Sequence, residues 1–220
     1  MFTTIVCALS GVLWQDQPLR ETVLQELLLR ENIAPRRRHP WYQGGSDRDF
    51  LRQLWDSYGR SVSDSYLTQL VQRFHQQYTQ ALTRLSALPW HPDALAFLQQ
   101  AQERGYRLGC QTECADIGIL GDAAGWFHFY VADYRDLADP EHTLVVESTR
   151  NGLLQARASG AWVLGVARQM PYHWVQRYSH WAIDTLADWD WARIPPAPRA
   201  PAVSPAPAAT DAETRTEPPR

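Results

Sequence analysis

The sequence has 220 residues, of which 45% are hydrophobic and 20% charged, which suits one globular domain or a core with a smaller insertion. A formal net charge of −3 gives no reason to expect a nucleic acid or an anionic membrane as the main partner. We find no run of 18 apolar residues and no basic segment followed by an apolar stretch, so neither a membrane span nor a secretory signal is expected. Three cysteines favour reduced thiols, and we expect a cytoplasmic protein.

The N-terminal part predicts one strand followed by helices. Residues 4–7 are an apolar, β-branched run typical of a buried parallel strand, and Gly11 then permits a tight turn. Apolar residues next recur at helical spacing over residues 18–32, 47–58 and 64–86. The segment 15–88 is therefore predicted to be a helical unit with little strand character.

From residue 89 onward, helical patterns alternate with short strands. The predicted helices cover residues 92–104, 151–159 and 170–178. The predicted strands cover residues 107–112, 129–132, 144–147, 161–166 and 181–183. This alternation predicts an α/β fold with a doubly wound, Rossmann-like parallel sheet, in which a helical cap (15–88) is inserted into a core formed by 1–14 and 89–194.

The C-terminal segment has a different composition. Residues 195–220 consist mainly of Pro, Ala and small polar residues without an apolar pattern. Such a segment cannot bury enough apolar surface to offset the entropy of ordering it, so we predict a disordered tail.

Three segments follow strands of the predicted core, at the edge where doubly wound sheets bind ligands. They read ALSGVL (8–13), QTEC (111–114) and ESTRNG (147–152). Three further patterns occur in the core: Gly-x-Arg-Leu at 105–108, VVESTRNGLLQARASGAWVLGV (145–166) and HWAIDTLADW (180–189). Together these segments follow the order of the motifs of a known superfamily. The chain resembles the haloacid dehalogenase (HAD)-like superfamily, in particular its capped phosphatase and phosphoglucomutase branch.

The resemblance implies an aspartyl-phosphate chemistry whose residues are missing here. The family's nucleophilic Asp aligns with Ala8, its acid–base Asp with Ser10, and an acidic Mg²⁺ ligand with Ser148. The family's lysine has no counterpart, because all 21 basic residues are Arg. These degenerate positions predict no catalytic residue, no metal site and no cofactor, although the family as a whole uses Mg²⁺.

The sequence therefore favours a catalytically inactive protein that acts as a protein-binding, assembly or regulatory factor. Ten Trp residues and the Pro/Ala-rich tail suit a protein partner. One alternative is an active, phosphatase-like hydrolase with a non-standard site built from Cys110, Glu113 or Asp116. Another is a sensor that binds a phosphorylated metabolite without turnover.

Several residues have two interpretations. A vestigial pocket of Ser10, Gly11, Thr112, Glu147 and Thr149 could still hold phosphate, or its hydroxyls could only bond nearby backbone. Arg135 could supply the positive charge that the family's lysine provides.

Two clusters elsewhere are also open to two interpretations. Cys7, Cys110 and Cys114 could converge on a metal or a reactive thiol, or be small buried residues. The run Arg36–His39 could bind phosphate or an acidic partner, or be a solvated loop. GGSDRDF at 44–50 aligns with the family's substrate-contacting cap segment, and equally predicts a helix start capped by Ser46 with Asp49.

Overall fold

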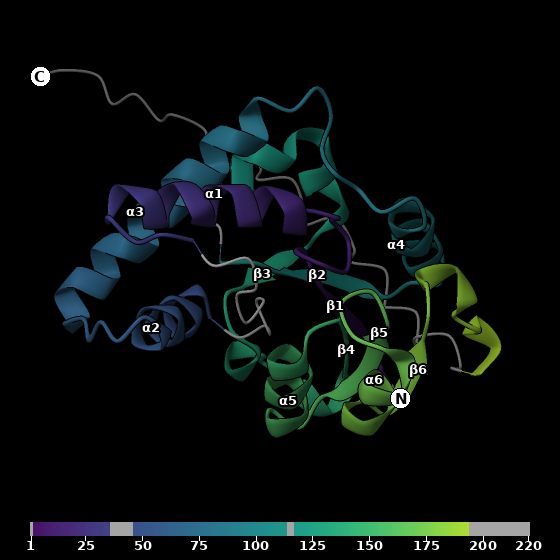
Figure 1. The fold of residues 1–220 in the computed structure, drawn as a ribbon. Helices are drawn as coiled ribbons and strands as arrows, with labels where there is room; N and C mark the ends of the chain where they lie inside the picture. The colour runs from purple at the N-terminus through teal and green to yellow at the C-terminus, as the bar shows by residue number, and fades with distance from the viewer. Residues whose placement is uncertain (1, 36–45, 114–116, 194–220) are drawn as a thin grey trace, which may run out of the picture.

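The computed structural model describes residues 2–35, 46–113 and 117–193 and is built around one parallel sheet. The strands, in the spatial order β3-β2-β1-β4-β5-β6, are all parallel to their neighbours (Figure 1). Their bounds are β1 Thr4–Ala8, β2 Arg107–Gln111, β3 Phe129–Val131, β4 Thr143–Glu147, β5 Trp162–Val166 and β6 Trp181–Ile183. The predicted fold class is confirmed, and each predicted strand is present to within one residue at either end.

Six α-helices are described, at positions close to those predicted. They are α1 Gln17–Arg30, α2 Asp47–Ser57, α3 Asp64–Thr83, α4 Ala94–Glu103, α5 Arg150–Ala158 and α6 Tyr172–Tyr178. Helix α6 begins two residues later than predicted, because the extended backbone of Pro171 stands at its N-cap. Short 3₁₀ segments connect the other elements at Ile117–Trp126, Tyr134–Asp136, Pro140–His142, Leu186–Asp188 and Trp191–Arg193.

Helices cover both faces of the sheet. Ile5 and Cys7 of β1 point into a cluster that includes Phe97 of α4, whereas Val6 points into a second cluster with Leu153 of α5 and Val175 of α6. This alternation follows from the period of two along a strand and explains why each strand is a continuous apolar run. The arrangement is the doubly wound layering that the alternating sequence pattern predicts.

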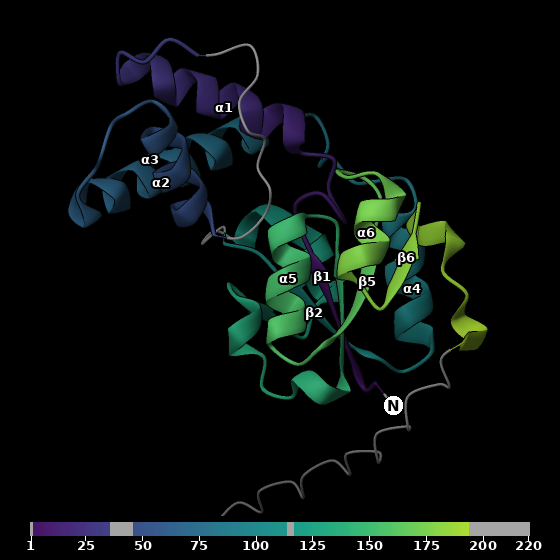
Figure 2. The ribbon, with the colours of Figure 1, turned by 60° about the horizontal axis from the view of Figure 1, so that its bottom comes forward.

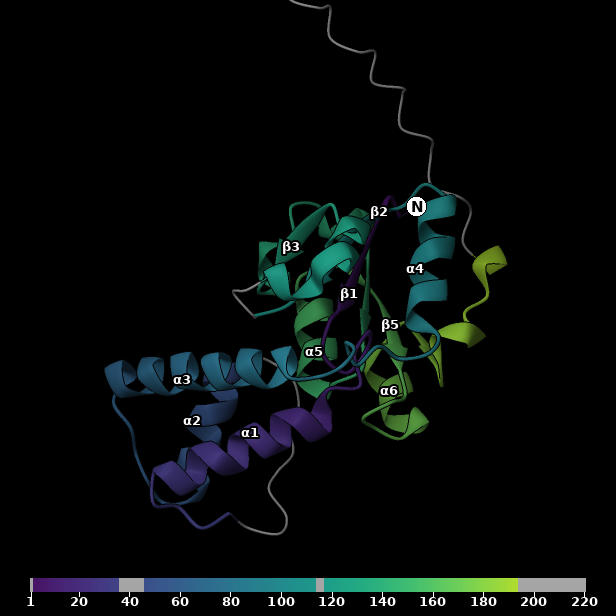
Figure 3. The ribbon, with the colours of Figure 1, turned by 90° about the horizontal axis from the view of Figure 1, so that it is seen from above.

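Helices α1, α2 and α3 lie apart from the sheet, at the end where β1 leads into α1 (Figures 2 and 3). They pack on one another through buried side chains such as Leu27, Leu54 and Leu70. These are the helices that the sequence places in the inserted unit. They therefore stand over the carboxyl ends of the strands. No helix within the described ranges is long and apolar enough to cross a membrane.

Candidate functional site

The ends of three neighbouring strands bring the degenerate motif positions together. Strand β1 lies between β2 and β4, with Ala8 beside Gln111 and Cys7 beside Val146. Residues that follow these strands, such as Thr112 and Ser148, consequently flank the end of β1. This is the location at which open α/β sheets bind their ligands.

The end of β1 carries a methyl group and a tight turn. Ala8 is buried, and the amides of Leu13 and Trp14 donate hydrogen bonds to the carbonyls of Ala8 and Leu9 at 3.3 and 2.8 Å. Gly11 has φ of +78°, and a Cβ there would lie 2.9 Å from the Ser148 hydroxyl. The end of β1 therefore leads into a tight turn that a side chain at Gly11 would disturb, and Ala8 places no carboxylate there.

Ser10 donates a hydrogen bond to a carboxylate that the sequence patterns did not single out. Its hydroxyl lies 2.9 Å from Oδ1 of Asp16, and the Tyr78 hydroxyl lies 2.5 Å from Oδ2 of the same residue. Asp16 is 1% exposed. Because each of its oxygens accepts a hydrogen bond and the side chain is enclosed, Asp16 holds the loop and α3 together and does not replace the lost nucleophile.

The hydroxyls and the carboxylate after β4 have structural partners, with one exception. Glu147 accepts hydrogen bonds from the amides of Ser148 and Thr149 at 2.7 and 2.9 Å and from the Tyr134 hydroxyl at 2.8 Å. Burial raises the pKa of Glu147, although these hydrogen bonds act in the opposite direction. The Thr149 hydroxyl caps α5 by accepting from the amide of Gly152, whereas the buried Ser148 Oγ has no partner within the described part of the chain.

Thr112 lines a cavity at the ends of the strands, whereas Arg135 does not. Thr112 donates its amide to the Val131 carbonyl at 3.0 Å and lines a cavity with Ser10. The Arg135 guanidinium instead pairs with Asp133, two residues away, and its side chain is 78% exposed. It therefore does not supply the positive charge that the family's lysine gives.

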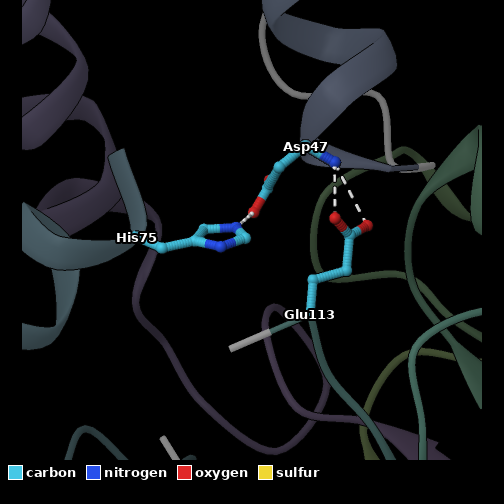
Figure 4. Close-up of side chains that lie close together, drawn as sticks. All are labelled: Asp47, His75 and Glu113. Atoms are coloured by element: carbon cyan, nitrogen blue, oxygen red, sulfur yellow. Dashed lines mark hydrogen bonds and ion pairs between the residues drawn. The ribbon is translucent and has the colours of Figure 1, made fainter. Parts of the chain in front are cut away.

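A cluster of charged groups stands on the cap side of this cavity. Asp47 at the start of α2, His75 in α3 and Glu113 after β2 line the cavity, whose volume is about 30 Å³. His75 Nε2 lies 2.8 Å from Asp47 Oδ2, and the Asp47 amide donates to both Glu113 oxygens at 3.0 and 3.1 Å (Figure 4). The other Asp47 oxygen pairs with Arg20 of α1.

The pKa values of the two carboxyl groups in this cluster are shifted in opposite directions. Burial raises the pKa of Asp47, but the charge of Arg20 and the hydrogen bond from His75 outweigh it, so that the net pKa is lowered. Burial, and then the negative charge of Asp47, raise the pKa of Glu113 to about 8. At neutral pH Asp47 therefore carries the charge and Glu113 holds a proton.

The remaining candidates do not contribute to the cavity. Cys7 and Cys110 are fully buried, and burial raises the pKa of each thiol well above its usual value, so neither is a ready nucleophile. Cys114, Asp116 and the run Arg36–His39 lie outside the described residues. Ser46 does cap α2, by accepting from the amide of Asp49 at 3.0 Å.

Sequence patterns missed Asp16, Asp47 and His75. Asp47 reads as an ordinary acid in the first turn of a helix, and His75 follows Phe74 in an apolar repeat. Asp47 and Glu113 are 66 residues apart, so no local motif could have linked them. Only the position of Glu113 directly after a strand end gave a usable signal.

Comparisons with known proteins identify the fold. No family model matches the chain, and no curated protein matches it. Among solved structures, β-phosphoglucomutase from Clostridium difficile is 13% identical to this chain, with a TM-score of 0.70. The alignment covers 88% of this chain and 95% of that one. A HAD hydrolase of family IA, variant 3, from Entamoeba histolytica is 15% identical with a TM-score of 0.71, covering 87% and 96%.

A third solved structure is CbbY from Rhodobacter sphaeroides in complex with phosphate. It is 14% identical with a TM-score of 0.66, and the alignment covers 86% of this chain and 96% of that one. Likeness at such identities concerns the fold and not the reaction. The chain has the capped fold of the haloacid dehalogenase-like superfamily.

Proposed function

We propose that this chain is a non-catalytic protein of the HAD-like fold, which acts by binding a protein partner. The observation that carries the proposal is Ala8 at the buried end of β1, where the fold's chemistry needs a carboxylate oxygen to attack phosphorus. The hydroxyl of Ser10, at the proton-transfer position, does not titrate near neutral pH and is bonded to Asp16.

The Mg²⁺ ion that the fold family implies does not fit the residues at this position. The side chain of Ala8 offers no ligand atom. Ser148 offers one buried hydroxyl, which has no hydrogen-bond partner among the described residues. A hard divalent cation requires several carboxylate or carbonyl oxygens. The side chains at the end of β1 therefore do not form a Mg²⁺ site.

The character of the cavity argues against a phosphate sensor. Its walls carry the ionised Asp47, while the guanidinium of Arg20 is already paired with that carboxylate. An anionic metabolite would have to displace this ion pair.

One observation favours the enzymatic alternative. Glu113 lines the cavity and has a raised pKa, which is the property of many general acids. Two nearby side chains do not serve as its nucleophile, however, since the Cys110 thiol is buried and the Ser10 hydroxyl is engaged with Asp16.

A groove beside the last strand of the sheet is the surface we assign to the partner. Strand β6 stands at the sheet edge, and a cavity of about 440 Å³ follows it, lined by Trp181, Trp189, Asp184, Asp188 and Gln176. Aromatic side chains supply large apolar contacts at protein interfaces, and the half-buried Trp181 lines this groove. The aspartates favour a basic partner segment.

Turnover assays test the loss of catalysis. The purified full-length chain, incubated with Mg²⁺ and a panel of phosphoesters, should release no phosphate above a blank. Phosphate release that disappears in Glu113→Gln, and persists in the exposed control Glu103→Gln, would contradict the proposal and establish the enzymatic alternative.

Affinity purification tests the groove. Gln176→Trp should fill it from the exposed side of α6 and abolish recovery of a protein that the unaltered chain retains. The neighbouring change Arg177→Trp, which lies outside the groove lining, should leave recovery unchanged. Equal recovery with both variants would show that the partner binds elsewhere.

A further inference from the structure

Three side chains of metal-ligating type converge on the cap side of the cavity. A ligand atom from each of Asp47, His75 and Glu113 lies within 4.8 Å of the other two. Figure 4 shows the imidazole and the Glu113 carboxylate approaching Asp47 from different elements. All three residues line one cavity, so their ligand atoms have a common space with room for an ion and a water molecule.

The surroundings of the cluster hold these atoms in position. Arg20 pairs with Oδ1 of Asp47, which leaves Oδ2 directed to His75. The guanidinium itself lies 5.1 Å from the ring centroid of Phe74 and 5.3 Å from that of Tyr78, and these contacts fix its location. Carboxylates that bind metals usually accept such a hydrogen bond from an outer group.

The donor set selects the kind of ion. One imidazole nitrogen and two carboxylate oxygens suit Zn²⁺, which is bound by such mixed sets with a water in the remaining position. Mg²⁺ prefers an all-oxygen octahedral shell.

We propose that Asp47, His75 and Glu113 bind one divalent transition-metal ion, of the type of Zn²⁺. Its ligands are other residues than Ala8 and Ser148, which stand at the positions of the fold's Mg²⁺ site, although Ser10 lines the same cavity. Its ligands come from α2, from α3 and from the segment after β2, so that a bound ion joins the cap helices to the sheet. The inference does not depend on whether the chain catalyses a reaction.

Titration of the full-length, EDTA-treated chain with ZnCl₂ alone tests the site. Calorimetry should show saturable binding that weakens by more than about tenfold in His75→Gln and in Glu113→Gln. The matched controls His142→Gln and Glu103→Gln alter exposed residues away from the cavity and should bind like the unaltered chain. Co²⁺ in place of Zn²⁺ should give visible absorption bands that the two ligand variants lose.

The outcomes separate this site from metal binding elsewhere in the chain. Absence of Zn²⁺ binding, equal binding in the ligand variants and the unaltered chain, or displacement by equimolar Mg²⁺ would each overturn the proposal. Circular dichroism checks the fold of each variant. If Glu113→Gln does not fold, His75→Gln decides the question, because its side chain is 21% exposed and its replacement disturbs the core less.

Discussion

Two adjacent hydroxyls after β4 show how differently neighbouring polar residues are used. The Thr149 hydroxyl donates to Glu147 at 3.0 Å and accepts from the Gly152 amide at 3.2 Å. The Ser148 hydroxyl is equally buried but has no partner in the described ranges. A buried polar atom without a partner costs free energy, whereas a satisfied one stabilises its surroundings.

Substitution of these two residues should therefore have unequal effects. Thr149→Val should lower the free energy of unfolding by about 1–3 kcal/mol, because it removes a helix cap and a hydrogen bond to Glu147. Ser148→Ala should leave it within about 0.5 kcal/mol of the unaltered chain, or raise it. Urea unfolding measures both. A loss in Ser148→Ala as large as in Thr149→Val would show that the Ser148 hydroxyl has an essential partner.

Motif positions were accessible from the sequence, and spatial neighbours were not. Ala8, Ser10 and Ser148 were identified by the resemblance of short segments at strand ends to the motifs of a known superfamily. Asp16 accepts a hydrogen bond from Tyr78, 62 residues away, and the Asp47 amide donates to Glu113, 66 residues away. Such pairs depend on how the cap helices settle against the sheet, which no local pattern of charge or hydrophobicity specifies.

At the scale of elements, the contact between β5 and α6 depends on a glycine. A Cβ on Gly165 would lie 2.2 Å from Cγ1 of Val175 and 2.9 Å from the Ser179 hydroxyl. Helix α6 thus approaches the strand more closely than any larger residue permits. The bounds of the strands were predicted to within one residue from their short apolar runs, whereas the start of α6 depended on the backbone of Pro171.

Gly165→Ala should consequently destabilise the protein through overpacking. We expect the free energy of unfolding to fall by about 1–3 kcal/mol, because Val175 and the backbone of α6 must move. Gly125→Ala is the matched control, since a Cβ there meets nothing within 4 Å, and its effect should stay within about 0.5 kcal/mol. Thermal unfolding followed by circular dichroism distinguishes them, and equal melting temperatures would contradict the tight packing.

At the scale of the whole molecule, one ion pair joins three distant parts of the core. Asp93, before α4, lies 2.5 Å from the Arg168 guanidinium and accepts the Leu186 amide at 2.7 Å. Burial raises the pKa of Asp93, but Arg168 and the amide outweigh it and hold the net pKa below the usual range. Asp93 thereby joins the segment before α4 to the segments that follow β5 and β6.

The stability that this attachment gives should depend on pH. A carboxylate with a lowered pKa stabilises the folded state above its unfolded pKa of about 4, and the stabilisation disappears as the pH falls through the folded value. Asp93→Asn should therefore cost about 1–3 kcal/mol at pH 7 and nearly nothing at the acid limit of folding. The exposed control Glu26→Gln should show no such trend. A cost that is independent of pH would refute the electrostatic account.

The shared carboxylate of Asp16 has a consequence for motion. Its two oxygens are held by Ser10 of the sheet-end loop and by Tyr78 of α3. An outward movement of α3 would remove one of the two hydrogen-bond donors from this enclosed carboxyl group. We expect slow hydrogen exchange of the backbone amides of α3 near Tyr78. Exchange should be faster in Tyr78→Phe, because that variant lacks the hydroxyl that joins α3 to Asp16.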